Sequence, residues 1–134
     1  HFSLDARDLA RLVQTVNDPH VGVCLDSVNS IARLEGWREV VTHLAPHTVS
    51  LHLKDAGVQR AGVGFCISGR PLGQGMVDIP YIVQQVRANG RPCNALLEFW
   101  MDPAADAETT LRQEEQWVAD GLAYAQRIVN AQRG

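Results

Sequence analysis

The sequence predicts an α/β fold built on a parallel sheet, and two observations lead to that prediction. Stretches with the apolar spacing of helices alternate with short apolar runs of strand length, in the order helix, strand, helix, strand, loop, helix, strand, helix. The strand candidates are almost wholly apolar, which is typical of strands covered on both faces. Alternation of this kind implies right-handed crossovers that join parallel strands and place helices on the sheet.

Apolar spacing and end signals predict the elements of the first half. Ser3 is expected to cap the first helix, with Asp5 in its first turn, where a carboxylate suits the positive end of the helix dipole. The apolar run before Asp26 is expected to be a strand. The predicted segments are, in order, a helix that stops at 17–19, a strand at 21–25, a helix from 31 or 36 to 45, and a strand at 49–53.

A glycine-rich stretch opens the second half. Residues 56–77 show no clear periodicity, so we expect a long irregular loop of the kind that is often functional or mobile. Asp78 directly precedes Ile79 and Pro80 and is expected to cap a new helix, because proline is tolerated in a first turn. The remaining predicted segments are a helix that stops at 89–90, a strand at 94–97, and a long terminal helix after 102–103.

Length and charge narrow the class of protein. The 134 residues suffice for one compact domain, taken as residues 1–134. A formal net charge of −3 gives no electrostatic reason to bind nucleic acid or an anionic membrane, and no apolar run is long enough to span a bilayer. The three cysteines lack paired spacing, so reduced thiols in a cytoplasmic protein are expected. The composition is compatible with a homo-oligomer as well as with a monomer.

The predicted sheet is small for a complete core. Three parallel strands leave two apolar edges without a partner. The chain also begins with His1 rather than Met. We therefore expect it to be part of a larger sheet or barrel, in which the strand at 21–25 has an unpaired edge.

Each predicted strand ends in a potential metal ligand, namely Asp26, His52 and Glu98. Because the carboxyl ends of parallel strands lie on one side of a sheet, these three side chains can converge there. Two carboxylates and one imidazole suit a divalent cation such as Mn²⁺, Mg²⁺ or Zn²⁺. The competing interpretation makes the carboxylates helix or turn caps and the histidine a core residue.

The predicted strand at 49–53 ends in further polar groups. With the two-residue period of a strand, His52 and Lys54 project to one face, and Lys54 is the only lysine of the chain. The simpler interpretation is a core histidine bonded to a backbone carbonyl, with Asp55 capping the next turn. The ligands expected on the neighbouring strands favour a functional interpretation over this one.

Four motifs resemble those of a known family. They are Cys24–Asn29, His52–Asp55, Pro71–Gly75 followed by Val77 and Asp78, and Leu97–Phe99. In order and spacing they resemble the sugar phosphate isomerase/epimerase family, which has the xylose isomerase-like (β/α)8 TIM barrel. The resemblance implies that this chain covers about the last three to four βα units, with strands six to eight, as the carboxyl-terminal part of one barrel domain.

The resemblance also implies roles for individual residues. Asp26, His52 and Glu98 would be metal ligands, and Glu98 would also be the catalytic residue that moves a proton. The usual fourth ligand, a glutamate at the end of strand five, would precede His1 and is absent from this sequence. The expected substrate-binding residues are His1, Asn29, Lys54, Arg60, Arg70 and Trp100.

Some of these positions have a competing interpretation. Asn29 stands where many members of the family carry a histidine. For Arg60 and Arg70, a solvated position in a loop explains the charge equally well. For Trp100, packing in the core is an equal alternative to an apolar wall for a sugar.

The implied activity is that of a divalent-metal-dependent isomerase or epimerase. Its substrate would be a small sugar, a sugar phosphate or a related hydroxyketone, deprotonated to a metal-stabilised enediolate. The runner-up is a dehydratase or lyase that acts on a keto-cyclitol or keto-sugar with the same metal site. The third alternative is a catalytically inert barrel segment that serves as a binding module, which the absent glutamate and Asn29 favour.

Overall fold

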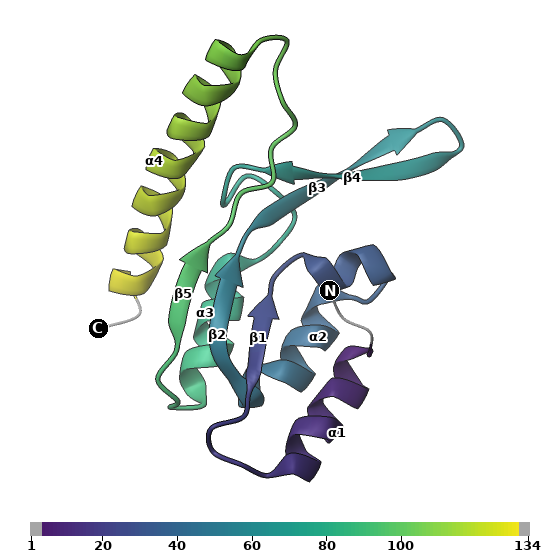
Figure 1. Cartoon of the computed structure of the whole chain (residues 1–134), viewed down its shortest axis with the longest axis vertical. Coiled ribbons are helices and arrows are strands. Elements are labelled where there is room, and N and C mark those ends of the chain that lie inside the picture. Colours follow the sequence, from purple (N-terminus) through teal and green to yellow (C-terminus); the bar gives the residue numbers. More distant parts are fainter. Residues whose placement is uncertain (1–3, 132–134) are drawn as a thin grey trace.

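The fold consists of a parallel sheet, helices that cover one of its faces, and a hairpin that projects from the body (Figure 1). The computed structural model describes residues 4–131. The helices are α1 (Ala6–Val16), α2 (Trp37–Leu44), α3 (Ile79–Ala88) and α4 (Ala107–Ala131). The strands are β1 (Val23–Asp26), β2 (Thr48–Leu53), β3 (Asp55–Ala61), β4 (Gly64–Arg70) and β5 (Asn94–Leu97). Short 3-10 helices span Asn29–Arg33 and Ala45–His47.

The sheet has β2 at its centre, between β1 and β5, and both pairings are parallel. In the observed register Asp26 lies beside His52, and His52 lies beside Leu96. The parallel α/β architecture expected from the sequence is therefore confirmed. Because the strands run in one direction, their carboxyl ends share one edge of the sheet.

The two faces of the sheet differ in what covers them. On one face Leu25, Leu51 and Leu53 are buried with the apolar residues of α2 and α3, which lie behind the sheet in Figure 1. Alternation along each strand sends Cys24 and His52 to the opposite face. Within residues 4–131 this second face is open, and Cys24 on it is exposed.

Both outer strands of the sheet keep a free edge in the described part of the chain. Between residues 4 and 131, β1 and β5 each pair with β2 alone. An open sheet with one bare face is the arrangement expected of a partial barrel, whose missing strands would pair with these edges. Across the same residues, no helix is both long and apolar enough to cross a membrane.

The first helix begins later than predicted, and the second takes the later of its two predicted starts. Asp5 is the N-cap of α1 rather than a first-turn residue, since its side chain accepts a hydrogen bond from the Asp8 backbone N–H. Ser3, the predicted cap, lies outside the described residues. The region from 31 to 45 contains a 3-10 helix and then α2, because Leu34 adopts φ 63° and interrupts the helical path.

An antiparallel hairpin made of β3 and β4 replaces the irregular loop predicted over 56–77, and that prediction was wrong. Val58 pairs with Ile67 in this ladder, and Gly62 with φ 57° lies in the turn. The glycines hid the strands from sequence reasoning, because each one interrupts the apolar alternation. Only residues 71–78 form an irregular connection between β4 and α3.

Candidate metal centre

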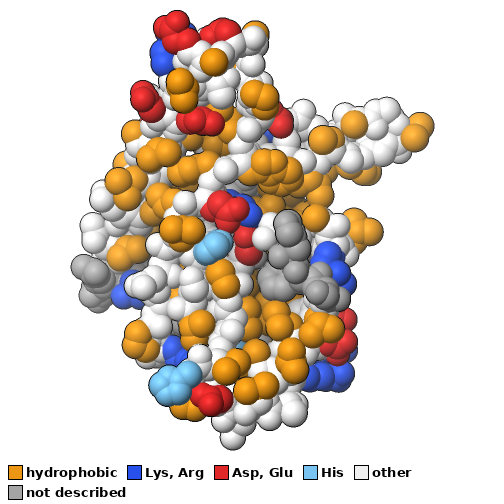
Figure 2. Space-filling view, in the orientation of Figure 1, with side chains coloured by type: hydrophobic (Ala, Val, Ile, Leu, Met, Phe, Trp, Pro, Cys, Tyr) orange, Lys and Arg blue, Asp and Glu red, His pale blue; other side chains and the backbone are white. Residues whose placement is uncertain are grey.

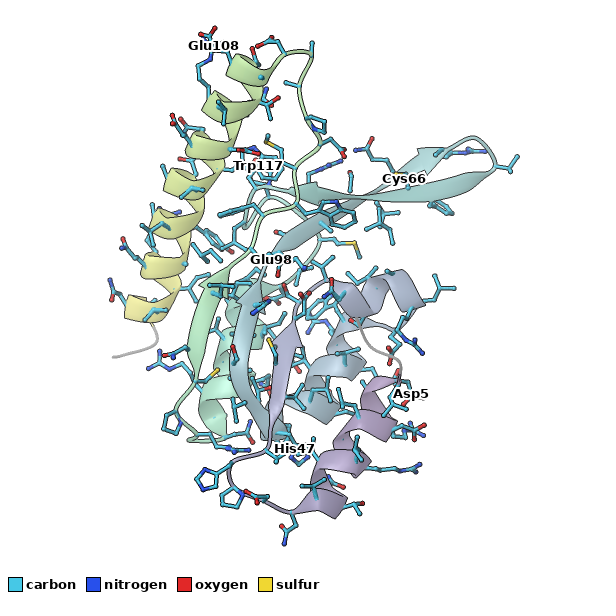
Figure 3. The ribbon with its side chains drawn as sticks, viewed as in Figure 1. Asp5, His47, Cys66, Glu98, Glu108 and Trp117 are labelled. Carbon is cyan, nitrogen blue, oxygen red and sulfur yellow. The ribbon has the colours of Figure 1, made fainter. Side chains whose placement is uncertain are left out.

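Asp26, His52 and Glu98 come together at the carboxyl edge of the sheet; Figure 3 shows Glu98 just beyond the end of β5. One potential ligand atom from each residue lies within 4.8 Å of the others. Backbone hydrogen bonds continue the ladder past the strands, from Ser27 N to His52 O at 3.2 Å and from Glu98 N to Leu53 O at 3.0 Å. The same pairing that forms the sheet therefore brings the three side chains to one place.

The Asp26 carboxylate is buried and fixed by the turn that follows β1. Its Oδ1 accepts hydrogen bonds from the backbone N–H groups of Val28 and Asn29, each at 2.9 Å. Its Oδ2 forms an ion pair with Lys54 Nζ at 2.9 Å and has no further partner among residues 4–131. Among the described residues, the buried Asp26 Oδ2 is thus held by the Lys54 ammonium alone.

Lys54 places a buried ammonium between the two carboxylates. Its side chain is 7% exposed, and Nζ lies 2.9 Å from Asp26 Oδ2 and 2.9 Å from Glu98 Oε1. Burial acts to lower the pKa of Lys54, but the contacts with the two carboxylates outweigh burial and raise that pKa above its ordinary value. Ser27 holds the backbone in place, since its Oγ accepts from Lys54 N and donates to Lys54 O.

The Glu98 carboxylate contacts both the Lys54 ammonium and the His52 imidazole. Its Oε1 accepts from Lys54 Nζ, and its Oε2 lies 2.9 Å from His52 Nδ1. The hydrogen bond from Lys54 lowers the pKa of Glu98, and the bond to His52 lowers it further, so Glu98 is ionised at neutral pH. The side chains of His52 and Glu98 are 31% and 41% exposed, which leaves this half of the site open to a ligand.

The donor set fits a divalent cation. Two carboxylates and one imidazole lie close enough together to contact a single ion, and the buried Asp26 Oδ2 accepts no hydrogen bond within residues 4–131. Carboxylate oxygen with imidazole nitrogen is a ligand combination used for Mn²⁺, Mg²⁺ and Zn²⁺. The two acidic side chains are already paired with Lys54, so a bound cation would share them with an ammonium.

A cavity of about 380 Å³ adjoins the site on the open face of the sheet. It is lined by Leu9, Gly22, Val23, Cys24, Asp26, Asn29 and His52. Figure 2 shows acidic, basic and histidine side chains gathered in the middle of this face, with hydrophobic side chains around them. The cavity therefore offers space beside two of the candidate ligands.

The other predicted substrate-binding residues are scattered. Asn29 lines the cavity, whereas Arg60, Arg70 and Trp100 are not among its lining residues. Arg60 is exposed on the hairpin, and the Arg70 guanidinium donates to Ser68 Oγ and to Gly69 O. Trp100 is 46% exposed and does not pack in the core. His1 lies outside the described residues.

Two residues of the site were not identified from the sequence. Cys24 lines the cavity, and its position two residues before Asp26 on the same strand face was a usable signal. Ser27 is buried and bridges β1 to the end of β2 through both hydrogen bonds to the Lys54 backbone. Ser27 lies within the motif Cys24–Asn29, but its role could not be predicted from the sequence because its partner is 27 residues away.

The fold and the site define a class of protein. The chain belongs to the xylose isomerase-like TIM barrel family, whose model matches residues 1–128. A 3-oxo-isoapionate decarboxylase of Pectobacterium atrosepticum is 38% identical over 120 residues, which are 88% of this chain and 44% of that protein. The chain therefore spans less than half the length of this curated relative.

Solved structures agree on the fold. A xylose isomerase domain protein from Planctomyces limnophilus matches with a TM-score of 0.70 at 20% identity, over 96% of this chain and 44% of the other. A xylose isomerase-like TIM barrel protein from Mycobacterium smegmatis, in complex with magnesium, matches with a TM-score of 0.73 at 14% identity, over 94% and 40%. The described residues thus form a partial barrel of an enzyme fold, as the sequence resemblance implied.

Proposed function

We propose that this chain supplies three ligands of a divalent-metal site in an enzyme that decarboxylates a small 3-oxo sugar acid. The observation that carries the proposal is the convergence of Asp26, His52 and Glu98 at the carboxyl edge of three adjacent parallel strands. The similarity to a 3-oxo-isoapionate decarboxylase supports the choice of reaction. Mn²⁺ and Mg²⁺ are the preferred cations, because two of the three ligands are carboxylates.

The residues of the site suit a reaction that passes through an enolate. A divalent cation held by the three ligands would supply Lewis acidity that polarises a carbonyl oxygen of the substrate. In decarboxylation the bond to the carboxylate carbon breaks, CO₂ leaves, and the electron pair forms the enolate. The hydrogen-bonded pair of His52 and Glu98 can hold the proton that the enolate carbon then takes up.

The test measures metal binding and chemistry separately in the full-length protein. We expect Mn²⁺ to bind with one ion per chain and to support CO₂ release from 3-oxo-isoapionate. Replacement of His52 by Gln should weaken Mn²⁺ binding, whereas His20→Gln, in an exposed turn, should leave it unchanged. Failure of the wild-type protein to bind any divalent cation would exclude the proposal.

An isomerase or epimerase acting on a hydroxyketone is the second candidate. The observation that favours it is the hydrogen bond between His52 and Glu98, since an ionised Glu98 can accept the α-proton of a ketose. Exchange of the α-proton of D-xylulose with solvent deuterium, with no release of CO₂ from the 3-oxo acid, would select this candidate. In both cases we propose a small carbohydrate ligand and a cytoplasmic location, in agreement with the three free cysteines.

A further inference from the structure

Lys54 already occupies the carboxylate oxygens that a metal ion would use. Asp26 Oδ1 is engaged by two backbone N–H groups, so Oδ2 is the oxygen left for a cation. That oxygen lies 2.9 Å from Lys54 Nζ, and Glu98 Oε1 lies at the same distance. The ammonium therefore stands between the two acidic ligands and neutralises their mutual repulsion.

The position of this ammonium is built into the fold. Both hydrogen bonds of Ser27 Oγ are to the backbone of Lys54, so the start of the side chain cannot shift without breaking buried contacts. The side chain itself is 7% exposed, so the ammonium is shielded from bulk water. A cation that binds Asp26 and Glu98 must therefore displace the ammonium from its contacts or remain close to it.

We propose that Lys54 is a built-in competitor for the metal: it holds Asp26 and Glu98 together in the metal-free protein and weakens the affinity of the site for a divalent cation. This inference rests on the proposed metal site and goes beyond it, because it assigns Lys54 to control of metal occupancy rather than to contact with substrate. A positive charge this close to the site repels a second cation. A tenfold change in the dissociation constant of Mn²⁺ corresponds to about 1.4 kcal/mol.

The experiment compares Mn²⁺ affinity in four forms of the full-length protein, by electron paramagnetic resonance of free Mn²⁺. Lys54→Met removes the ammonium, and Lys54→Arg keeps a positive charge. Arg7→Gln is the matched control, because it removes one positive charge from an exposed pair with Glu39 at 3.7 Å. We expect Lys54→Met to bind Mn²⁺ about tenfold more tightly than wild type. Lys54→Arg and Arg7→Gln should stay close to wild type.

Thermal unfolding supplies the second measurement. Without metal, Lys54→Met should unfold at a lower temperature than wild type, because the two carboxylates then face each other without a cation. Saturating Mn²⁺ should close this gap, since the ion takes over the role of the ammonium. If metal-free Lys54→Met does not fold, Lys54→Gln gives the same comparison with an amide that can donate to one carboxylate.

The outcomes separate the inference from the proposed function. Wild-type protein that binds no Mn²⁺ would overturn the metal site and this inference together. Wild-type binding with unchanged or weaker affinity in both neutral Lys54 variants would overturn the inference alone. Tighter binding in Arg7→Gln of the same size as in Lys54→Met would also overturn it, because the effect would then belong to net charge and not to the site.

Discussion

The Asp55 carboxylate accepts a hydrogen bond from the backbone N–H of Gly75 at 2.9 Å, and with it orders the connection that leads to α3. The same oxygen accepts from Gly73 N at 3.0 Å, while the other accepts from Ala56 N and Val77 N. A Cβ at position 75 would lie 2.1 Å from an Asp55 oxygen, which explains why a glycine ends the turn at residues 73–75. The turn is thus folded around one buried carboxylate.

We expect Asp55→Asn to destabilise the protein severely. The amide keeps the size of the carboxylate but turns an NH₂ group toward two of the backbone N–H donors, which lose their acceptor at a buried side chain. The free energy of unfolding should fall by about 2–4 kcal/mol, measured by urea denaturation. Asp18→Asn, at an exposed turn, should change it by less than about 0.5 kcal/mol. Equal effects of the two substitutions would contradict the role of Asp55.

Glu98→Gln tests the catalytic role proposed for this carboxylate. Glutamine keeps the size and one acceptor oxygen but cannot take up a proton near neutral pH. Turnover should fall by about 10²- to 10⁴-fold, and saturating Mn²⁺ should not restore it. Glu39→Gln, which removes the same charge from an exposed position on α2, should retain full turnover. Near-normal turnover of Glu98→Gln at saturating metal would leave Glu98 as a ligand only.

The packed face of the sheet and the projecting hairpin should respond very differently to truncation. Leu25 is fully buried on β1, so Leu25→Ala should lower the free energy of unfolding by about 2–5 kcal/mol. Phe65 on β4 is 77% exposed, and Phe65→Ala should change it by no more than about 0.5 kcal/mol. Denaturant titrations of both variants check the contrast. A large loss of stability in Phe65→Ala would show that another surface covers the hairpin.

The start of α4 should be sensitive to acid through Asp106. Its carboxylate accepts hydrogen bonds from the backbone N–H and the hydroxyl of Thr109, and these bonds hold the pKa of Asp106 below its ordinary value of 3.8. A lowered pKa means that the cap stabilises the fold above pH 3.8 and that this contribution disappears as the pH falls through the pKa of the folded state.

Asp106→Asn provides the comparison, because asparagine also caps helices but does not titrate. We expect wild type to be more stable than Asp106→Asn near neutral pH, and we expect this difference in stability to vanish as the solution is acidified. Thermal unfolding at each pH, monitored by circular dichroism, measures the difference. The acid sensitivity of all other carboxylates cancels in this difference. A gap that is independent of pH would refute the role of the Asp106 charge.

The sequence by itself determined the elements of the sheet and the residues at its carboxyl edge. Apolar runs of strand length end at Asp26, at His52 and just before Glu98, and parallel crossovers place such ends on one side. These features could be predicted because they depend on local periodicity and on one general rule of chain direction. The cap Asp78 could be predicted for the same reason, since it contacts Tyr81 only three residues away.

Tertiary structure alone decided how those residues are used. Lys54 was predicted as a substrate-binding residue, and that role stays a prediction. Contacts with residues 28 and 44 positions away in sequence bury its ammonium between two carboxylates. Nothing local distinguishes Ser27, which meets Lys54 only once β1 and β2 are paired. The hairpin likewise could not be predicted from the sequence, because its glycines interrupt the apolar alternation that is typical of a strand. It is defined by the backbone pairing of β3 with β4. Burial and pairing between distant segments are properties of the assembled sheet, and they set the charge environment of the metal centre.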